Sequence, residues 1–198
     1  MNENDKSKPN LFERIRLTRL LSVFPERPVR AIFVFINGFI TIAILAAVAM
    51  ISKSPFVFPS LGPTAFLFFF SPTQPSASPR NTIYGHVIGI LCGYGALLIT
   101  GLDQAPPAIV AGVDMNRIFA AALSLAATGF FMVLFKSPHP PAGATTLIIS
   151  LGIVSRPFYL LVIAVAVGLL TIQAIVINRL AGINYPLWSA KQDSAAQK

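Results

Sequence analysis

Lys136-Ser-Pro-His-Pro-Pro-Ala-Gly-Ala-Thr-Thr-Leu-Ile-Ile-Ser150 is a polar, proline-rich turn between two runs that are long enough to cross a bilayer. An earlier stretch, Lys53-Ser-Pro-Phe-Val-Phe-Pro-Ser-Leu-Gly-Pro-Thr-Ala-Phe-Leu67, repeats the order Lys-Ser-Pro, then Pro, then Gly-x-Thr, with two more residues in the middle. In each copy the prolines force an extended backbone, and the Thr opens a short apolar segment. Each copy therefore predicts a loop that leads into a short helix.

The composition indicates an integral membrane protein of one domain. The chain is 55% hydrophobic and only 11% charged, which is not typical of soluble globular proteins. Four uncharged runs each have about the length of one spanning helix: Ala31 to Ser52, Thr82 to Leu102, Ile118 to Phe135 and Pro157 to Asn178. We therefore expect an all-α, polytopic membrane protein with four transmembrane helices plus the two shorter helices.

The charge distribution predicts how the chain is oriented. Lys and Arg outnumber Asp and Glu by 15 to 7, and seven of these basic residues lie in the first 30 positions. Basic residues beside a first span hold it on the cytoplasmic side, so the excess indicates topology rather than nucleic-acid binding. We expect a basic cytoplasmic or interfacial segment (1–30), a transmembrane domain (31–188) and a polar tail (189–198), with both termini in the cytoplasm.

The two short helices, expected at Pro63 to Phe70 and Ala142 to about Val154, have too few residues to span a bilayer, so we interpret them as re-entrant. The order of span, short helix and span then occurs twice, over about 31–100 and 117–180, as a two-fold internal repeat. Re-entrant helices make the two units parallel, with both motif loops on the same side. If either short segment crosses completely, the repeat is inverted.

The two breaks predict a binding site, because backbone outside a helix is tolerated at membrane depth only inside protein or beside a wet cavity. A helix N-terminus presents unpaired N–H groups and the positive end of the helix dipole, so two that face each other suit a small anion. The candidate substrate-binding residues come from the two motif copies and from one histidine inside the second span: Lys53, Gly62, Thr64, Lys136, His139, Gly143, Thr145, Thr146 and His86.

Each candidate side chain also has a purely structural interpretation. The threonine hydroxyls can cap the short helices. Lys53 and Lys136 can extend to lipid headgroups, and His86 can bond a backbone carbonyl. His139, flanked by prolines, can donate to an anion or pass on a proton.

A stripe of small residues in the second span predicts close helix packing. Gly85, Gly89 and Gly93 recur at spacing four, which allows another helix to approach closely. The third span has its own small face, formed by Ala120, Ser124 and Thr128, and we expect it to receive the glycines.

The sequence does not favour a metal site or an enzyme. His86 and His139 offer two metal ligands, but no carboxylate occurs in any span, so we expect no metal and no cofactor. An intramembrane enzyme needs a nucleophile with a base, and the spans offer isolated hydroxyls, Cys92 and His86. We therefore expect no enzymatic activity.

The segment Ser137-Pro-His-Pro-Pro-Ala-Gly-Ala-Thr145, with Gly62-Pro-Thr64 upstream and four spans, closely resembles the HPP family of integral membrane proteins. The family is named for the triplet that here is His139-Pro140-Pro141, and the resemblance runs from about Arg30 to Trp188. Members with an assigned role are similar to transporters, and those of cyanobacteria and chloroplasts are linked to nitrite movement.

The resemblance implies a transporter or channel-like permease for a small anion, with nitrite as the best guess, in a bacterial plasma membrane. The alternative is a non-transporting scaffold or sensor subunit, in which the motif loops only pack helices. A bundle of four spans is small, which leaves a homo-oligomer open. Nucleic acid is not an expected partner.

Overall fold

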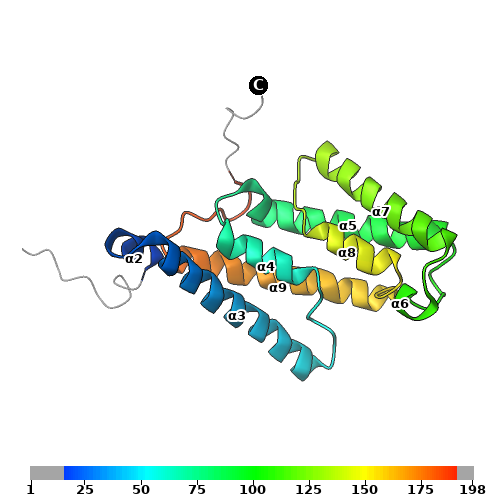
Figure 1. The fold of residues 1–198 in the computed structure, drawn as a ribbon, viewed down its shortest axis with the longest axis horizontal. Coiled ribbons are helices and arrows are strands. Elements are labelled where there is room, and N and C mark those ends of the chain that lie inside the picture. Colours follow the sequence, from blue (N-terminus) through cyan, green and yellow to red (C-terminus); the bar gives the residue numbers. More distant parts are fainter. Residues whose placement is uncertain (1–15, 191–198) are drawn as a thin grey trace, which may run out of the picture.

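The structure is a computed structural model that describes residues 16–190, and over this range it is all-helical (Figure 1). The elements in chain order are α2 (Leu17–Val23), α3 (Glu26–Ser52), α4 (Leu61–Phe70), η1 (Pro75–Ala77), α5 (Pro79–Ile99), α6 (Ala108–Ala111), α7 (Met115–Leu134), α8 (Ala142–Ser150) and α9 (Pro157–Leu180). Four of them, α3, α5, α7 and α9, are long and apolar enough to cross a membrane, which confirms the predicted spans. Residues 1–15 of the basic segment and 191–198 of the polar tail lie outside the described residues.

Some spans begin earlier than the uncharged runs predict. Helix α3 starts at Glu26, and Pro28 lies in its first turn. N–H groups in the first turn have no intrahelical acceptor, so the N–H that proline lacks costs the helix no hydrogen bond. Helix α7 starts just after Asp114, whose side chain accepts a hydrogen bond from the N–H of Arg117 at 2.8 Å. Charged and capping residues at a helix end thus extend the helix beyond its apolar run.

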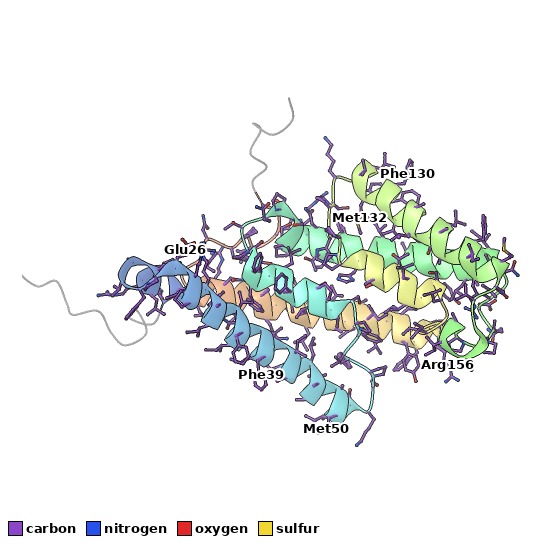
Figure 2. The ribbon with its side chains drawn as sticks, in the orientation of Figure 1. Glu26, Phe39, Met50, Phe130, Met132 and Arg156 are labelled. Carbon is purple, nitrogen blue, oxygen red and sulfur yellow. The ribbon has the colours of Figure 1, made fainter. Side chains whose placement is uncertain are left out.

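The helices form two groups of three. Helix α8 packs between α5 and α7, while α4 packs against α3 and α9, and the contact of α5 with α9 joins the groups. Helix α3 diverges from the others toward its C-terminal end (Figure 1). Phe39, on α3, is 69% exposed and points away from the bundle (Figure 2), a position that suits lipid.

One end of the bundle, here called the terminal end, brings both chain ends of the described part together. The N–H of Arg80, at the start of α5, donates to the carbonyl of Trp188 at 3.0 Å. The Arg80 guanidinium also donates to the carbonyls of Phe135 and Lys136, which follow α7. Lys136 therefore lies at the terminal end, where α5 begins and the residues after α9 return.

The opposite end, here called the distal end, contains α6 and the loop between α8 and α9. The N–H of Ala108 donates to the carbonyl of Leu151 at 2.9 Å. Figure 2 shows Glu26 at the terminal end and both Met50 and Arg156 toward the distal end. Because Lys53 directly follows α3, it lies on the distal side, away from Lys136.

The two motif loops therefore enter the bundle from opposite ends. Helix α4 begins near the centre and runs to the terminal end, whereas α8 begins near the centre and runs to the distal end (Figure 1). These opposite directions differ from those expected of two parallel re-entrant helices.

Both motif copies leave their preceding helix in the same conformation. Lys53 has φ 55° and Lys136 has φ 49°, and they are the two non-glycine residues with positive φ among the described residues. A left-handed residue commonly terminates a helix, and the prolines that follow favour extended backbone. The shared Lys-Ser-Pro sequence thus forms the same helix stop twice.

Candidate functional site

A buried polar cluster lies where the two short helices begin. Its four side chains are Thr64 of α4, His86 of α5, His139 of the loop before α8, and Thr145 of α8, each at most 1% exposed. All four were predicted as site residues. The structure brings them together although they come from both motif copies and from the second span.

His86 contacts the two motif copies with its two ring nitrogens. Its Nε2 lies 3.0 Å from Oγ1 of Thr64, and its Nδ1 lies 2.8 Å from Oγ1 of Thr145. Each threonine is the fourth residue of its short helix and follows the motif glycine by two positions. The equivalent residue of each copy therefore points at the same imidazole.

His139 bonds to the connector between α4 and α5. Its Nδ1 lies 2.7 Å from the carbonyl oxygen of Ser76 and 3.4 Å from Oγ1 of Thr82. Its Nε2 lies 3.3 Å from Oγ1 of Thr64, and its ring centroid is 5.0 Å from that of His86. Thr64 is thus the common neighbour of the two histidines.

The glycine stripe of α5 allows this close approach, and its nearest neighbours are the second motif loop and α8, with Met132 of α7 beside Gly85. A Cβ on Gly85 would lie 2.6 Å from Cβ of His139, and one on Gly89 would lie 2.8 Å from the carbonyl oxygen of Ala142. The stripe therefore receives the second motif loop and α8. The small face of α7 packs on α8 as well, where Thr128 and Thr146 share a hydrogen bond of 2.8 Å.

The backbone donors at the start of α8 are not free, in contrast to the expectation. The N–H groups of Ala142, Gly143 and Ala144 donate to the carbonyls of His139, Pro140 and Pro141, in that order, at 3.0 to 3.1 Å. In α4, Pro63 has no N–H, and Leu61 donates to Phe58 at 2.9 Å. The side chains of Thr64, His86, His139 and Thr145 are therefore the main groups available to a ligand.

The other predicted residues lie outside this cluster. Lys53 and Lys136 are exposed at the distal and terminal ends. Gly62 is exposed, and Gly143 is half-buried near the side chain of Leu125. Thr146 is buried beside the cluster, but it bonds to Thr128 and to the carbonyl of Ala142.

Sequence reasoning missed two groups that contact His139. Thr82 lies one turn before His86 on the same face of α5, so the spacing of four was a usable signal. Ser76 contributes only its carbonyl, which no side-chain pattern reveals. The turn that carries it is held by Tyr185, whose hydroxyl donates to the carbonyl of Ala77 at 2.5 Å, and burial raises the pKa of Tyr185 above its usual range.

A buried cation near the distal end was also missed. Arg117 is 2% exposed, and its guanidinium donates to the carbonyl of Pro106 through one nitrogen while Nη1 has no hydrogen-bond partner. This guanidinium packs against Gly152, whose φ is +73° and where a Cβ would lie 2.8 Å from Nη1. Gly152 also lines a cavity of about 380 Å³ together with Asp103 and Arg156.

The cluster offers too few ligands for a usual metal centre. Over residues 16–190, no group of three or more His, Cys, Asp and Glu side chains is placed to hold a metal ion. His86 and His139 alone provide half of the four ligands that a structural zinc site requires.

Comparisons with known proteins place the chain in a family. The family model described as HPP, transmembrane region, matches residues 25–186. Two transmembrane proteins of Dictyostelium discoideum are 32% identical over 155 residues and 30% identical over 134 residues, covering 74% and 65% of this chain. The matches cover 47% and 44% of those proteins, so the chain spans about half the length of the relatives it matches. No solved structure matches the chain.

Proposed function

The chain belongs to the HPP transmembrane family, and from this premise we propose that it transports a small anion, with nitrite as the first candidate. The observation that carries the proposal is the meeting of two short-helix N-termini around the buried Thr64, His86, His139 and Thr145 cluster. Polar side chains inside a membrane bundle are costly and mark substrate pathways. Helix breaks near the middle of a bundle mark the sites of many transporters.

In this proposal the chain is an inverted repeat with two broken crossings. The first unit is α3, the loop with α4, and α5, and the second is α7, the loop with α8, and α9. The opposite directions of α4 and α8 support this arrangement, as do the matching conformations of Lys53 and Lys136 and the matching positions of Thr64 and Thr145 on His86. An odd number of crossings in each unit makes the repeats inverted, and the loops are then parts of crossings rather than re-entrant hairpins.

In this proposal the cluster is the closed part of a path between two cavities. A cavity of about 1050 Å³ at the terminal end is lined by residues of α2, α3 and α4 and by the residues after α9. The 380 Å³ cavity lies at the distal end. Between them the four cluster side chains bond to one another, so transport requires that these bonds open toward one end at a time.

The groups that face the cluster favour an anion over a cation. Both short helices direct their positive dipole ends at it, and each end favours an anion by about 0.3 to 2 kcal/mol, depending on burial. The hydroxyl and imidazole groups can donate hydrogen bonds to oxyanions. Within residues 16–190 the buried Arg117 has no acidic side-chain partner, and its guanidinium lies against Gly152 of the distal cavity, which Asp103 and Arg156 also line.

Uptake into liposomes that contain the purified protein tests this function. Radiolabelled nitrite, nitrate, bicarbonate and formate are compared, with protein-free liposomes subtracted for leak. We expect saturable uptake of at least one anion, and a loss of about tenfold or more in His139→Ala and Thr64→Val. Thr171→Val is the matched control, because the buried Thr171 hydroxyl on α9 bonds only to the carbonyl of Val167, one turn before it.

Other results would redirect the proposal. Equal leak of all four anions with and without the protein would refute transport of these anions and favour the scaffold or sensor role. Loss of uptake in Thr171→Val equal to that in Thr64→Val would show that the cluster has no special part. Lys136→Ala is included because Lys136 is a predicted substrate-binding residue.

A further inference from the structure

We propose that His86 and His139 share one exchangeable proton through Thr64 and that the protein moves one proton together with each monovalent anion. This inference rests on the proposed transport of an anion. It begins from the directions of the hydrogen bonds in the cluster, because a carbonyl can only accept and each neutral imidazole has one donor and one acceptor nitrogen.

The Ser76 carbonyl determines the tautomer of His139. Since this oxygen lies 2.7 Å from Nδ1 of His139, Nδ1 carries the hydrogen. In the neutral ring Nε2 is then an acceptor, and it faces the hydroxyl of Thr64 at 3.3 Å. The Thr64 hydroxyl can donate to the carbonyl of Ser60 at 3.0 Å or to Nε2 of His139 at 3.3 Å. In this proposal it turns to His139, because the buried Nε2 has no other donor within reach among the described residues.

The directions of the remaining hydrogen bonds follow from the single hydroxyl hydrogen of Thr64. With that hydrogen on His139, the Thr64 oxygen accepts from Nε2 of His86 at 3.0 Å. Nδ1 of His86 is then the acceptor and receives the hydroxyl of Thr145 at 2.8 Å. An unbroken relay runs from Thr145 through His86, Thr64 and His139 to the Ser76 carbonyl.

This relay can carry an added proton without any side chain leaving its place. A proton that binds Nδ1 of His86 makes that ring a cation. The Nε2–H bond of His86 then breaks as its proton passes to the Thr64 oxygen, while the original Thr64 O–H bond breaks and that hydrogen binds Nε2 of His139. One N–H and one O–H bond are lost and one of each is formed, so the charge moves from His86 to His139.

In the described part of the chain, no acidic side chain bonds to either ring to balance the added charge. The groups that face the two rings are Thr64 from α4, Thr82 from α5, Thr145 from α8 and the Ser76 carbonyl from the connector. Helix α7 presents Met132, whose methyl group lies near Gly85. Among the described residues, the nearest charged side chain on α5 is Arg80, a further cation that is occupied by the carbonyls of Phe135 and Lys136.

An unpaired imidazolium in such surroundings is strongly unfavourable, so the proton needs an anion beside it. The anion in turn gains a second donor from the protonated ring. Proton and anion therefore bind together, and the pair that crosses the bundle has no net charge. This predicts electroneutral symport with one proton for each monovalent anion.

Two measurements on the same liposomes separate this inference from the proposed function. Exchange of labelled for unlabelled anion at equal pH reports transport that needs no net proton movement. Net accumulation under a pH gradient, with the membrane potential clamped by potassium and valinomycin, reports coupling. The probe is whichever of nitrite, nitrate, bicarbonate and formate exchanges fastest, and protein-free liposomes correct for passage of the neutral acid.

We expect about tenfold accumulation for a gradient of about one pH unit, because one coupled proton transmits the whole gradient. Accumulation should not change when the membrane potential is varied. In His86→Gln and His139→Gln, which keep a polar side chain but cannot hold the proton, accumulation should fall to about onefold while exchange persists at a lower rate. Thr171→Val should accumulate anion as the unchanged protein does.

The outcomes are distinct. If the unchanged protein exchanges anion but accumulates none under the pH gradient, or accumulates it according to the membrane potential, the shared proton is refuted and the transport function stands. If no anion exchanges, the transport function itself fails. Accumulation by the glutamine variants equal to that of the unchanged protein would refute the role of the two histidines. Should those variants not fold, Thr64→Val, which removes the hydroxyl between the two rings, should lose accumulation in the same way.

Discussion

The two motif copies have the same local structure but different surroundings. In each copy a lysine with left-handed backbone conformation follows a long helix, and Ser-Pro comes next. A short helix then begins, with threonine as its fourth residue. The second copy, however, packs deeply, with α8 between α5 and α7, whereas α4 packs against α3, the most exposed of the four spans, and against α9. Local sequence thus determines the shape of each copy, and its neighbours determine how firmly it is held.

The copies also differ in what they contribute to the cluster. The second copy supplies His139, while the corresponding part of the first copy is the apolar Phe56-Val57-Phe58. The second copy is anchored along the glycine stripe, and the first is anchored at its C-terminal end, where Asn178 donates to the carbonyl of Phe68 at 3.1 Å. We infer that α4 is the more easily displaced of the two short helices.

The largest expected effect concerns the sides from which the copies enter. In a Cys92→Ser background, which removes the one cysteine of the chain, Lys53→Cys and Lys136→Cys should react with a membrane-impermeant maleimide from opposite sides of the membrane. Both positions are exposed in the structure, so neither should be protected by packing. Labelling of sealed vesicles and of permeabilised vesicles measures this.

At each position the cysteine should be labelled almost completely from one side of the membrane and almost not at all from the other. Labelling of both cysteines from the same side would contradict the inverted arrangement and restore the re-entrant interpretation. A third variant, Ser22→Cys, marks the side of the first span's N-terminal end, because Ser22 is exposed in α2. It should label from the same side as Lys136→Cys.

The depth of packing of the second copy can be tested at the glycine stripe. Gly89→Ala places a Cβ 2.8 Å from the Ala142 carbonyl and 2.9 Å from Oγ1 of Thr146, so α8 must move. We expect a loss of about 1 to 3 kcal/mol of stability, typical of overpacking, and a strong loss of transport. Thermal unfolding in detergent measures the first and exchange in liposomes the second.

Gly95→Ala is the matched control on the same helix. No atom lies within 4 Å of the position that its Cβ would occupy, so the helix gains an alanine without a clash. We expect unchanged stability or a gain of up to about 1 kcal/mol. Equal destabilisation by both substitutions would mean that the stripe does not receive α8.

The anchor of the first copy should have a smaller effect. Asn178→Leu removes the amide that donates to the Phe68 carbonyl at the end of α4. We expect a loss of about 1 kcal/mol, because the bonds from Nδ2 to the buried carbonyls of Phe68 and Ala174 disappear, while the buried Oδ1 that has no partner is removed as well. Thermal unfolding of Asn178→Leu and of Gly89→Ala compares the stability that each contact contributes. A larger loss of stability in Asn178→Leu than in Gly89→Ala would contradict the prediction.

The smallest effects are expected at the lysines themselves. Lys53→Gln and Lys136→Gln remove exposed charges far from the cluster, so stability should change by no more than about 0.5 kcal/mol. If the charges attract the anion, each substitution should slow initial uptake from one side of the membrane only, by a few fold, with the other side unchanged. Uptake by oriented vesicles is measured in both directions at low and high salt. A slower rate from one side that disappears at high salt would support attraction of the anion by the lysine, and equal rates in all variants would contradict it.

The sequence alone determined the membrane class, the four spans and the two short helices. These features depend on local causes: runs of apolar residues long enough for a bilayer, and prolines and glycines that end or open a helix. The same local signals identified Thr64, His86, His139 and Thr145. Close packing at the glycines was also predictable, since the absence of a side chain is itself visible in the sequence.

Only the tertiary structure decided which elements meet. The glycine stripe receives the second motif loop and α8, with Met132 of α7 beside Gly85. The two motif loops enter from opposite ends, and both threonines contact a single histidine. The physical reason is that these relations depend on the direction in which each short segment crosses the bundle. That direction is set by contacts between residues far apart in the chain, such as Asn178 with Phe68 and His139 with Ser76.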